Sequence, residues 1–448
     1  MAKKPKGFGK KKKIPTRETR EFIIAFKART VEHGQDSEKV YELVEAKLDE
    51  SSLEAFPLVF NQLIANQTSQ ERKSIAGLFN FLGSLLAQFP RGDCQLNLEI
   101  SITVFQLALK VFIREVFPQD WASIQNNLAN AYLYRIRGER AENLEKAIAG
   151  YELALQVYTP SAFPQDWAMT QNNLANAYLY RIRGERAENL ETAIAGYELA
   201  LQVYTRSAFP QDWAMTQGNL ASVQLEQFEL TQELKYFDEA ISALQASLDV
   251  AIPKTDSYIY INYILGRALD HRYNLDRQPE DLEQAILSYH LAAENTPWES
   301  ARADYLEKAG DSQYELGVAL TQSGQWYKGL ATLEASLKTY RQVDNRLARG
   351  DALQQMARTH YLMSNFDQAK MYFRDALRLY LAEKNTIGEA HCRAGLGRLF
   401  LRLNYVEDAL QELEQACELY HQLEDETRLK EIQNVYQLAR KVKEKQPL

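Results

Sequence analysis

The stretch FPQDWASIQNNLANAYLYRIRGERAENLEKAIAGYELALQVYT runs from Phe117 to Thr159 and is written again, almost unchanged, from Phe163 to Thr205. The two copies differ at three of 43 positions: Ser123/Met169, Ile124/Thr170 and Lys146/Thr192. A third copy opens at Phe209 with FPQDWAMTQ and then diverges. A period of 46 residues is typical of proteins built from stacked supersecondary units, so this repeat decides the fold.

Each copy predicts two helices. The opening at Phe117 favours a helix start, because proline suits the first helical position and Asp120 complements the positive end of the helix dipole. Apolar residues then recur at three- and four-residue intervals on both sides of Gly138. They are Trp121, Ile124, Leu128, Tyr132 and Ile136 before it, and Leu144, Ala147, Ile148, Tyr151, Ala154, Leu155 and Tyr158 after it. A single hairpin cannot bury both apolar faces, so neighbouring copies must cover them.

The motifs Leu128-Ala129-x-x-Tyr132 and Ala147-x-x-x-Tyr151-x-x-Ala154 resemble the tetratricopeptide repeat, with about six extra residues between the helices. The same register can be followed through eight units. The small first-helix residue is Gly83, Ala129, Ala175, Ala221, Gly266, Gly317, Ala357 and Gly397, and the small second-helix residue is Ser101, Ala147, Ala193, Ala240, Ala285, Gly329, Ala369 and Ala409. An aromatic residue or leucine follows four positions later, at Phe105, Tyr151, Tyr197, Leu244, Tyr289, Leu333, Phe373 and Leu413. Small residues let crossing helices approach closely, so these positions specify the fold.

We therefore expect an all-α, tetratricopeptide-like superhelical solenoid of about eight helical hairpins with capping helices at both ends. The expected segments are a disordered basic tail (1–20), N-terminal capping helices (21–67), repeats of about 46 residues (68–309), 40-residue repeats (310–424) and a C-terminal capping helix (425–448). Residues 117–250 resemble the repeat arrays that accompany caspase-like CHAT domains in bacteria, here without the protease. Residues 310–424 resemble the 40-residue repeats of kinesin-light-chain and bacterial peptide-sensor arrays.

Charge is distributed unevenly along the chain. The 448 residues have a formal net charge of −8, but residues 1–20 carry nine Lys or Arg and one Glu, which leaves −16 on the remainder. The basic tail has three interpretations: a solvated, solubilising segment, a contact for nucleic acid or ribosomes, or a segment that folds back on the acidic array. The acidic remainder argues against binding of nucleic acid in a groove of the repeat array, because a surface that neutralises phosphates must be basic.

The sequence predicts a cytoplasmic protein with no membrane association. No apolar run approaches the roughly 20 residues that a membrane span needs, and the N-terminus lacks the apolar core of a signal peptide. Cys94, Cys392 and Cys417 have no metal-ligand spacing and are interpreted as small buried hydrophobic residues in a reducing compartment.

Catalytic chemistry is not expected. Gly7-Phe8-Gly9-Lys10 lacks the full phosphate-loop pattern and follows no strand. His391 and Cys392 are adjacent, so on a helix they point about 100° apart and cannot act together as base and nucleophile. The remaining histidines show no metal-binding spacing. We therefore expect no enzyme activity, no metal and no cofactor.

The resemblance implies that the first helix of each hairpin lines a concave groove in which a protein or peptide binds. The groove residues expected to contact the ligand are Asn126, Asn130, Tyr134, Asn172, Asn176, Tyr180, Tyr260, Tyr263, Arg267, Tyr314, Arg358 and Arg398. Asparagine both donates and accepts hydrogen bonds, so the four asparagines suit a peptide backbone. The other interpretation is that they bond one another between neighbouring helices and fix the stacking of the repeats.

These observations predict a non-catalytic scaffold or adaptor that binds a protein or peptide in the groove. Arginines toward the C-terminal end of the groove favour an acidic, aromatic-containing partner segment. The alternative is a regulator associated with nucleic acid or ribosomes, acting through residues 1–20.

Overall fold

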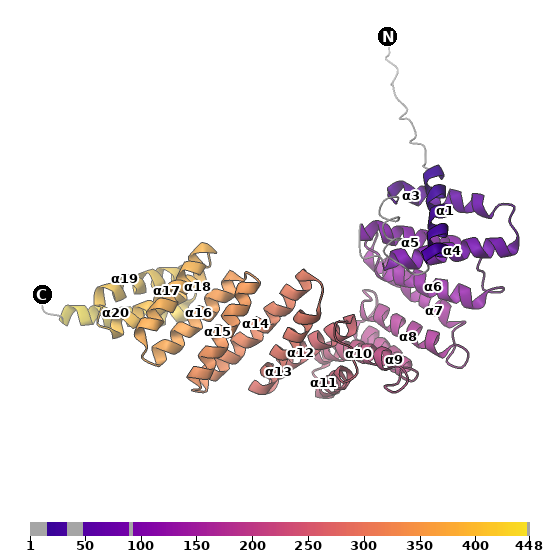
Figure 1. The fold of residues 1–448 in the computed structure, drawn as a ribbon. Helices are drawn as coiled ribbons and strands as arrows, with labels where there is room; N and C mark the ends of the chain where they lie inside the picture. The colour runs from indigo at the N-terminus through magenta and orange to yellow at the C-terminus, as the bar shows by residue number, and fades with distance from the viewer. Residues whose placement is uncertain (1–15, 34–47, 89–92, 446–448) are drawn as a thin grey trace, which may run out of the picture. The chain divides into compact units, whose positions relative to one another are not determined.

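The computed structural model describes residues 16–33, 48–88 and 93–445 (Figure 1). Within these ranges the chain forms 19 α-helices and no strand, which confirms the predicted all-α repeat solenoid. Contacts divide the chain into two compact units, Met1–Glu233 and Leu234–Leu448. This division falls at a different place from the change of repeat period expected at residue 310.

In the described part of the first unit, α1 (Thr16–His33) and α3 (Glu50–Ile64) precede the repeats. Three hairpins and one further helix follow: α4 (Ser69–Ala87) with α5 (Cys94–Ala108), α6 (Pro118–Leu133) with α7 (Arg140–Leu155), α8 (Pro164–Leu179) with α9 (Arg186–Leu201), and α10 (Pro210–Thr231). Phe22, Phe26, Phe56, Phe60 and Phe79 bury the preceding helices against the first hairpin.

The repeated Phe-Pro-Gln-Asp motif starts a helix in all three copies. Pro118, Pro164 and Pro210 each occupy the first turn of their helix, where the missing N–H costs no hydrogen bond. The connection from α6 to α7 turns at Gly138, whose φ of +79° is a conformation that glycine adopts without steric cost.

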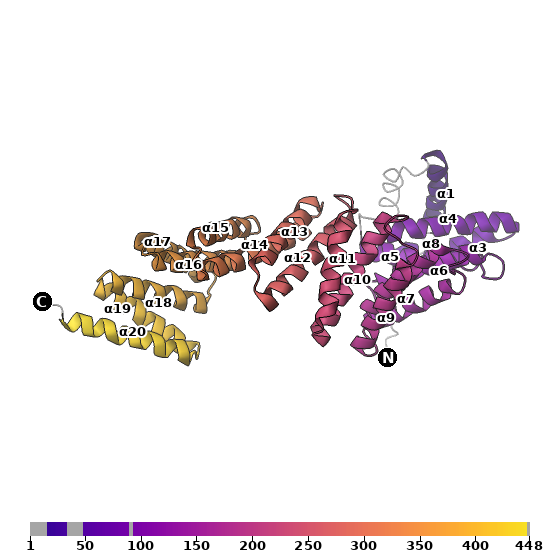
Figure 2. The same ribbon diagram turned by 90° about the horizontal axis from the view of Figure 1, so that it is seen from below.

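The second unit contains four hairpins between two single helices (Figure 2). Its elements are α11 (Leu234–Leu248), α12 (Asp256–Asp276), α13 (Pro279–Asn295), α14 (Glu299–Gln322), α15 (Trp326–Gln342), α16 (Arg346–Leu362), α17 (Phe366–Ala382), α18 (Thr386–Arg402), α19 (Val406–Gln422) and α20 (Glu426–Lys445). Asn345 and Asn385 cap α16 and α18, since each side-chain oxygen accepts a hydrogen bond from the backbone N–H three residues later. Ile432 and Ala439 of α20 join the core formed by Leu413 and Tyr420 of α19.

The expected small residues lie where the two helices of a hairpin touch. A Cβ placed on Gly83 would lie 2.7 Å from the Phe105 ring, and one on Gly397 would lie 2.5 Å from Leu413. Gly83 and Phe105 are the two register positions of the first unit, and Gly397 and Leu413 are those of the last. Close backbone approach at these sites fixes the spacing of the hairpin helices.

Residues 1–15 of the predicted basic tail lie outside the described residues. The expectation of disorder is wrong for Thr16–Arg20, which form the first turns of α1. This start is stabilised by burial of Phe22 and Phe26 and by an ion pair from Arg17 to Glu21, 2.9 Å long and one turn apart.

Two glycines of α4 allow a matched test of the close approach. Gly83→Ala should destabilise the protein by about 1–3 kcal/mol, because the new methyl group overlaps the Phe105 ring. Gly77→Ala should stabilise it by about 0.5–1 kcal/mol, because nothing lies within 4 Å of the added Cβ and alanine is the better helix former. Urea denaturation followed by circular dichroism measures both changes. Equal effects of the two substitutions would contradict the proposed packing.

Candidate functional site

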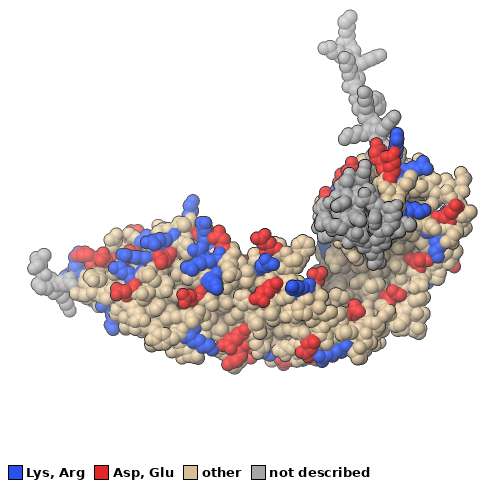
Figure 3. Space-filling model, in the orientation of Figure 1, with Lys and Arg blue, Asp and Glu red and all other residues tan. Residues whose placement is uncertain are grey.

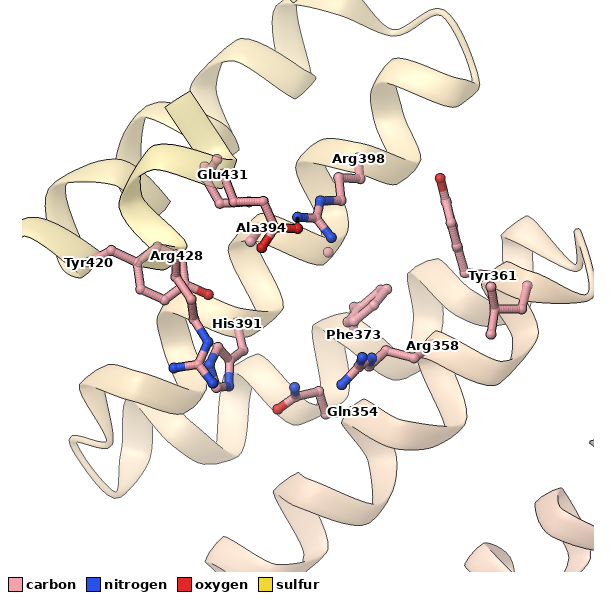
Figure 4. Close-up of a pocket in the computed structure, with 13 residues that line it drawn as sticks. Gln354, Arg358, Tyr361, Phe373, His391, Ala394, Arg398, Tyr420, Arg428 and Glu431 are labelled. Atoms are coloured by element: carbon pink, nitrogen blue, oxygen red, sulfur yellow. Dashed lines mark hydrogen bonds and ion pairs between the residues drawn. The ribbon is translucent and has the colours of Figure 1, made fainter. Parts of the chain in front are cut away.

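The second unit contains a cavity of about 390 Å³ lined mainly by first helices of the 40-residue repeats. Helix α16 contributes Arg358 and Tyr361, and helix α18 contributes His391 and Arg398, as Figure 4 shows. Leu362 of α16 also lines the cavity. Side chains of α17, α19 and α20 complete the lining: Phe373, Tyr420, Arg428, Glu431 and Ile432. The cavity is therefore an opening between successive hairpins, with apolar, aromatic and cationic groups facing the same space.

Three arginines approach this cavity, and they differ in their partners. Arg398 forms an ion pair with Glu431 at 2.5 Å, and Arg428 forms one with Asp425 at 2.5 Å. Arg358 is exposed and makes neither an ion pair nor a hydrogen bond with any residue in the described ranges. Figure 3 shows Lys and Arg side chains gathered over α16 to α19 on the face in view, among acidic ones.

His391 lies beside two of these arginines. Burial lowers the pKa of its imidazole, and the positive charges of Arg428 and Arg358 lower it further, while Asp425 opposes them. Its Nε2 is buried and has no hydrogen-bond partner among the described residues. The imidazole ring lies 6.0 Å from the Tyr420 ring, centroid to centroid.

The position of His391 is occupied by aspartate in the two preceding repeats. Asp311 accepts a hydrogen bond from Tyr340 at 3.0 Å, and Asp351 accepts one from Tyr380 at 2.6 Å. Residues 311, 351 and 391 are 40 residues apart, as are tyrosines 340, 380 and 420. The change from Asp to His in this register is the sequence signal for the site, and His391 is not among the groove residues predicted from the repeat pattern.

Two of the predicted groove arginines, Arg358 and Arg398, thus meet at one cavity. Tyr314 of α14 is half-buried in the core beside α16, and burial and nearby Asp351 raise its pKa to about 12. Tyr263 packs against Tyr305 at 5.1 Å between ring centroids, and Arg267 lies 5.9 Å from the Tyr263 ring. Tyr260 is half-buried on α12.

The asparagines of the 46-residue repeats require a correction. Asn126 and Asn172 are 2% and 5% exposed, so their amides do not face an open groove. The Oδ1 of Asn126 accepts a hydrogen bond from Asn173 Nδ2 at 3.3 Å, and that of Asn172 accepts one from Asn219 at 3.2 Å. These bonds join the first helices of successive repeats, as the stacking interpretation expects.

Asn130 and Asn176 serve the hairpins themselves. Each accepts a hydrogen bond from a buried tyrosine of its own second helix, Tyr151 at 2.6 Å and Tyr197 at 2.8 Å. Asn130 also lines a second cavity, of about 260 Å³, between α4, α5 and α6. Tyr134 lines the same cavity and is 64% exposed, and Tyr180 is also exposed.

The arginine-rich connections are neutralised mainly by neighbouring repeats. Arg135 pairs with Glu99 of α5 at 2.7 Å, and Arg181 pairs with Glu145 of α7 at 2.8 Å. Glu145 belongs to the hairpin that precedes the Arg181 connection. These ion pairs tie one hairpin to the next.

The three cysteines differ in exposure. Cys392 is buried, but Cys94 is exposed because it lies in the first turn of α5, so the expectation of three buried cysteines is wrong.

In the described residues, no group of three or more His, Cys, Asp or Glu could hold a metal ion, and no helix there is long and apolar enough to cross a membrane. Binding of nucleic acid or ribosomes through residues 1–20 stays a prediction.

Comparison with known proteins identifies the repeats. Residues 121–157 and 167–203 match one family described as tetratricopeptide repeat, and residues 309–382 match a second with the same description. The alpha-soluble NSF attachment protein of Vitis vinifera is 27% identical over 125 residues, which cover 25% of this chain and 43% of that protein. This chain thus spans less than half the length of that relative.

Two solved structures show similarity at low sequence identity. The apo form of the quorum sensor NprR from B. thuringiensis has 17% identity and a TM-score of 0.33, covering 81% of this chain and 99% of that chain. A signal-transduction ATPase with a tetratricopeptide-repeat sensor, from Pyrococcus horikoshii, has 14% identity and a TM-score of 0.35. That match covers 94% of this chain and 62% of that chain.

The structural role of the asparagines can be tested in Asn126→Ala. The substitution should destabilise the protein by about 1–3 kcal/mol, because it leaves the half-buried Asn173 amide without its acceptor. Asn61→Ala is the control, since Asn61 is exposed on α3, and it should be neutral or slightly stabilising. Urea denaturation compares the two, and equal stability of the variants would show that the asparagine bond does not hold the repeats together.

Proposed function

The chain carries tetratricopeptide repeats, and from this premise we propose that it is a non-catalytic scaffold that binds a protein or peptide in the groove of its second unit. The observation that carries the proposal is the cavity between α16 and α18, where side chains of two successive first helices converge. The binding site is thus assigned to the 40-residue repeats. The asparagines of the 46-residue repeats have a structural role instead.

The dimensions and lining of the cavity suit part of a polypeptide chain. Its volume of about 390 Å³ falls in the range of small ligand sites, about 300–1,000 Å³. Leu362 is 63% exposed at its edge, and Tyr361 and Phe373 lie beside it. An apolar side chain placed against Leu362 would be removed from water, and the arginines would orient polar groups next to it.

The proposal includes the cytoplasmic location expected from the sequence. Cys94, Cys392 and Cys417 are all free thiols, as is usual in a reducing compartment. The partner is expected to be a polypeptide, since a nucleic acid needs a basic surface along its successive phosphates and the chain outside residues 1–20 carries −16.

The proposal can be tested by selecting ligands from a phage library of random 12-residue peptides and measuring their affinity for variants. Leu362→Ala should weaken the selected peptides about 10- to 100-fold, since burying a leucine contributes about 1.5–3 kcal/mol. Leu381→Ala is the control, because Leu381 is similarly exposed but lies on α17 outside the cavity, and it should change affinity less than twofold. Failure to enrich any peptide, or equal effects of both variants, would contradict the proposal.

A further inference from the structure

We infer that the cavity between α16 and α18 binds a carboxylate side chain of an acidic polypeptide segment, and that His391 takes up a proton from solvent when the carboxylate binds. This inference rests on the proposed function and specifies the chemistry of the partner. It depends on three features of the cavity: an arginine without an ion pair among the described residues, a histidine at a position that is aspartate in the two preceding repeats, and a buried imidazole nitrogen that has no hydrogen-bond partner among those residues.

The charge of the lining favours an anion. Arg358, Arg398 and Arg428 face the cavity, and Glu431 is the acidic residue that faces it. Because Glu431 is already paired with Arg398, no acidic side chain of the lining offsets the positive charge of Arg358. A guanidinium without an acidic partner can form a bidentate, charge-assisted pair with an incoming carboxylate.

The repeat register explains why a carboxylate ligand would bind at this repeat and not at the two preceding ones. In the two preceding repeats the equivalent position carries Asp311 or Asp351, and each accepts a hydrogen bond from a tyrosine. A carboxylate ligand would meet a like charge there. At His391 that negative charge is replaced by an imidazole, and Arg358 lies on the adjacent first helix.

The titratable and charged groups near His391 come from α16, α19 and α20, while α17 supplies the apolar Phe373 to the cavity lining. Helix α16 supplies Arg358, α19 supplies Tyr420, and α20 supplies Arg428 and Glu431 (Figure 4). Asp425, just before α20, is paired with Arg428. Burial lowers the pKa of His391, and the positive groups outweigh the negative ones and lower it further, so the free protein holds His391 neutral at neutral pH.

A bound carboxylate would reverse this balance. Its negative charge offsets Arg358 and Arg428, and its oxygen can accept a hydrogen bond from the Nε2–H that protonation creates. The pKa of His391 is then higher in the complex than in the free protein. Because the complex binds one more proton, affinity must increase as pH falls through the range between the two pKa values.

The probe for this inference is fluorescein-labelled hexaglutamate with an amidated C-terminus, so that side chains supply every carboxylate. Hexaglutamine amide is the neutral control. Fluorescence anisotropy with the full chain should detect hexaglutamate but not hexaglutamine. Arg358→Gln should weaken hexaglutamate binding at least about tenfold.

Arg378→Gln is the matched charge control. Arg378 lies on α17 outside the cavity and its side chain is 78% exposed, so its loss should change affinity less than twofold. Both variants lose one positive charge, so any attraction of the probe to residues 1–20 is the same in each. Equal weakening by the two substitutions would overturn the inference. Free glutarate at 1 mM should not displace the probe, and complete displacement would show that a small dicarboxylate is the ligand.

The proton is tested by measuring hexaglutamate affinity between pH 7.5 and 6.0, where glutamate side chains stay ionised. Affinity should rise about fivefold as the pH falls, and His391→Gln should abolish the rise. His421→Gln is the control, because His421 is exposed on α19, and it should leave the rise unchanged. His391→Asp, which restores the aspartate of the other repeats, should abolish binding while circular dichroism confirms that the helices remain.

These outcomes separate the inference from the proposed function. If peptides selected from the random library require Leu362 but lack acidic residues, and hexaglutamate does not bind, the inference is wrong and the groove still binds peptides. If neither the library nor hexaglutamate yields a ligand, both fail. A pH dependence that persists in His391→Gln would overturn the proton uptake even if acidic peptides bind.

Discussion

The close approach of the two helices in each hairpin is the constraint on which the rest of the structure depends. At Gly83 and Gly397 no Cβ fits, because the ring of Phe105 and the side chain of Leu413 occupy that space. This contact fixes the distance between the helices and therefore the direction of every other side chain on them. When the contact is repeated at a regular period, equivalent residues of successive first helices fall on the same face.

A second constraint comes from the close packing of the helices. Several hairpins bury a tyrosine, and its hydroxyl then needs a hydrogen-bond acceptor inside the hairpin. The first helix supplies it: Asn130 for Tyr151, Asp270 for Tyr289 and Asp351 for Tyr380. Burial raises the pKa of these phenols, so the hydroxyl stays protonated and donates. Polar residues at these register positions are therefore required by the fold, whether or not a ligand binds beside them.

This requirement explains how far the sequence could predict the site. The repeat register identified the hairpins, because spacing and residue size alone determine which helices can pack. The register could not distinguish a structural asparagine such as Asn126, which bonds to Asn173 of the next repeat, from a ligand-binding one. Repeat stacking and ligand binding each require a polar residue at that position. Nor could the register bring Arg428 to His391, since that contact depends on how α20 folds back on α18 and α19.

The same reasoning locates where function can depart from structure. Where an aspartate accepts a bond from a buried tyrosine, changing it leaves a hydroxyl unpaired, so the position is held by stability. At His391 the neighbouring Tyr420 ring is 6.0 Å away and Nε2 has no partner among the described residues, so the side chain satisfies no such bond. A buried polar atom without a partner lowers stability unless something else pairs with it. In this repeat the hydrogen-bond partner that the fold does not supply is one that a bound carboxylate can provide once Nε2 is protonated. Arg358, which has no ion pair within the described residues, lines the same cavity and can hold the carboxylate charge.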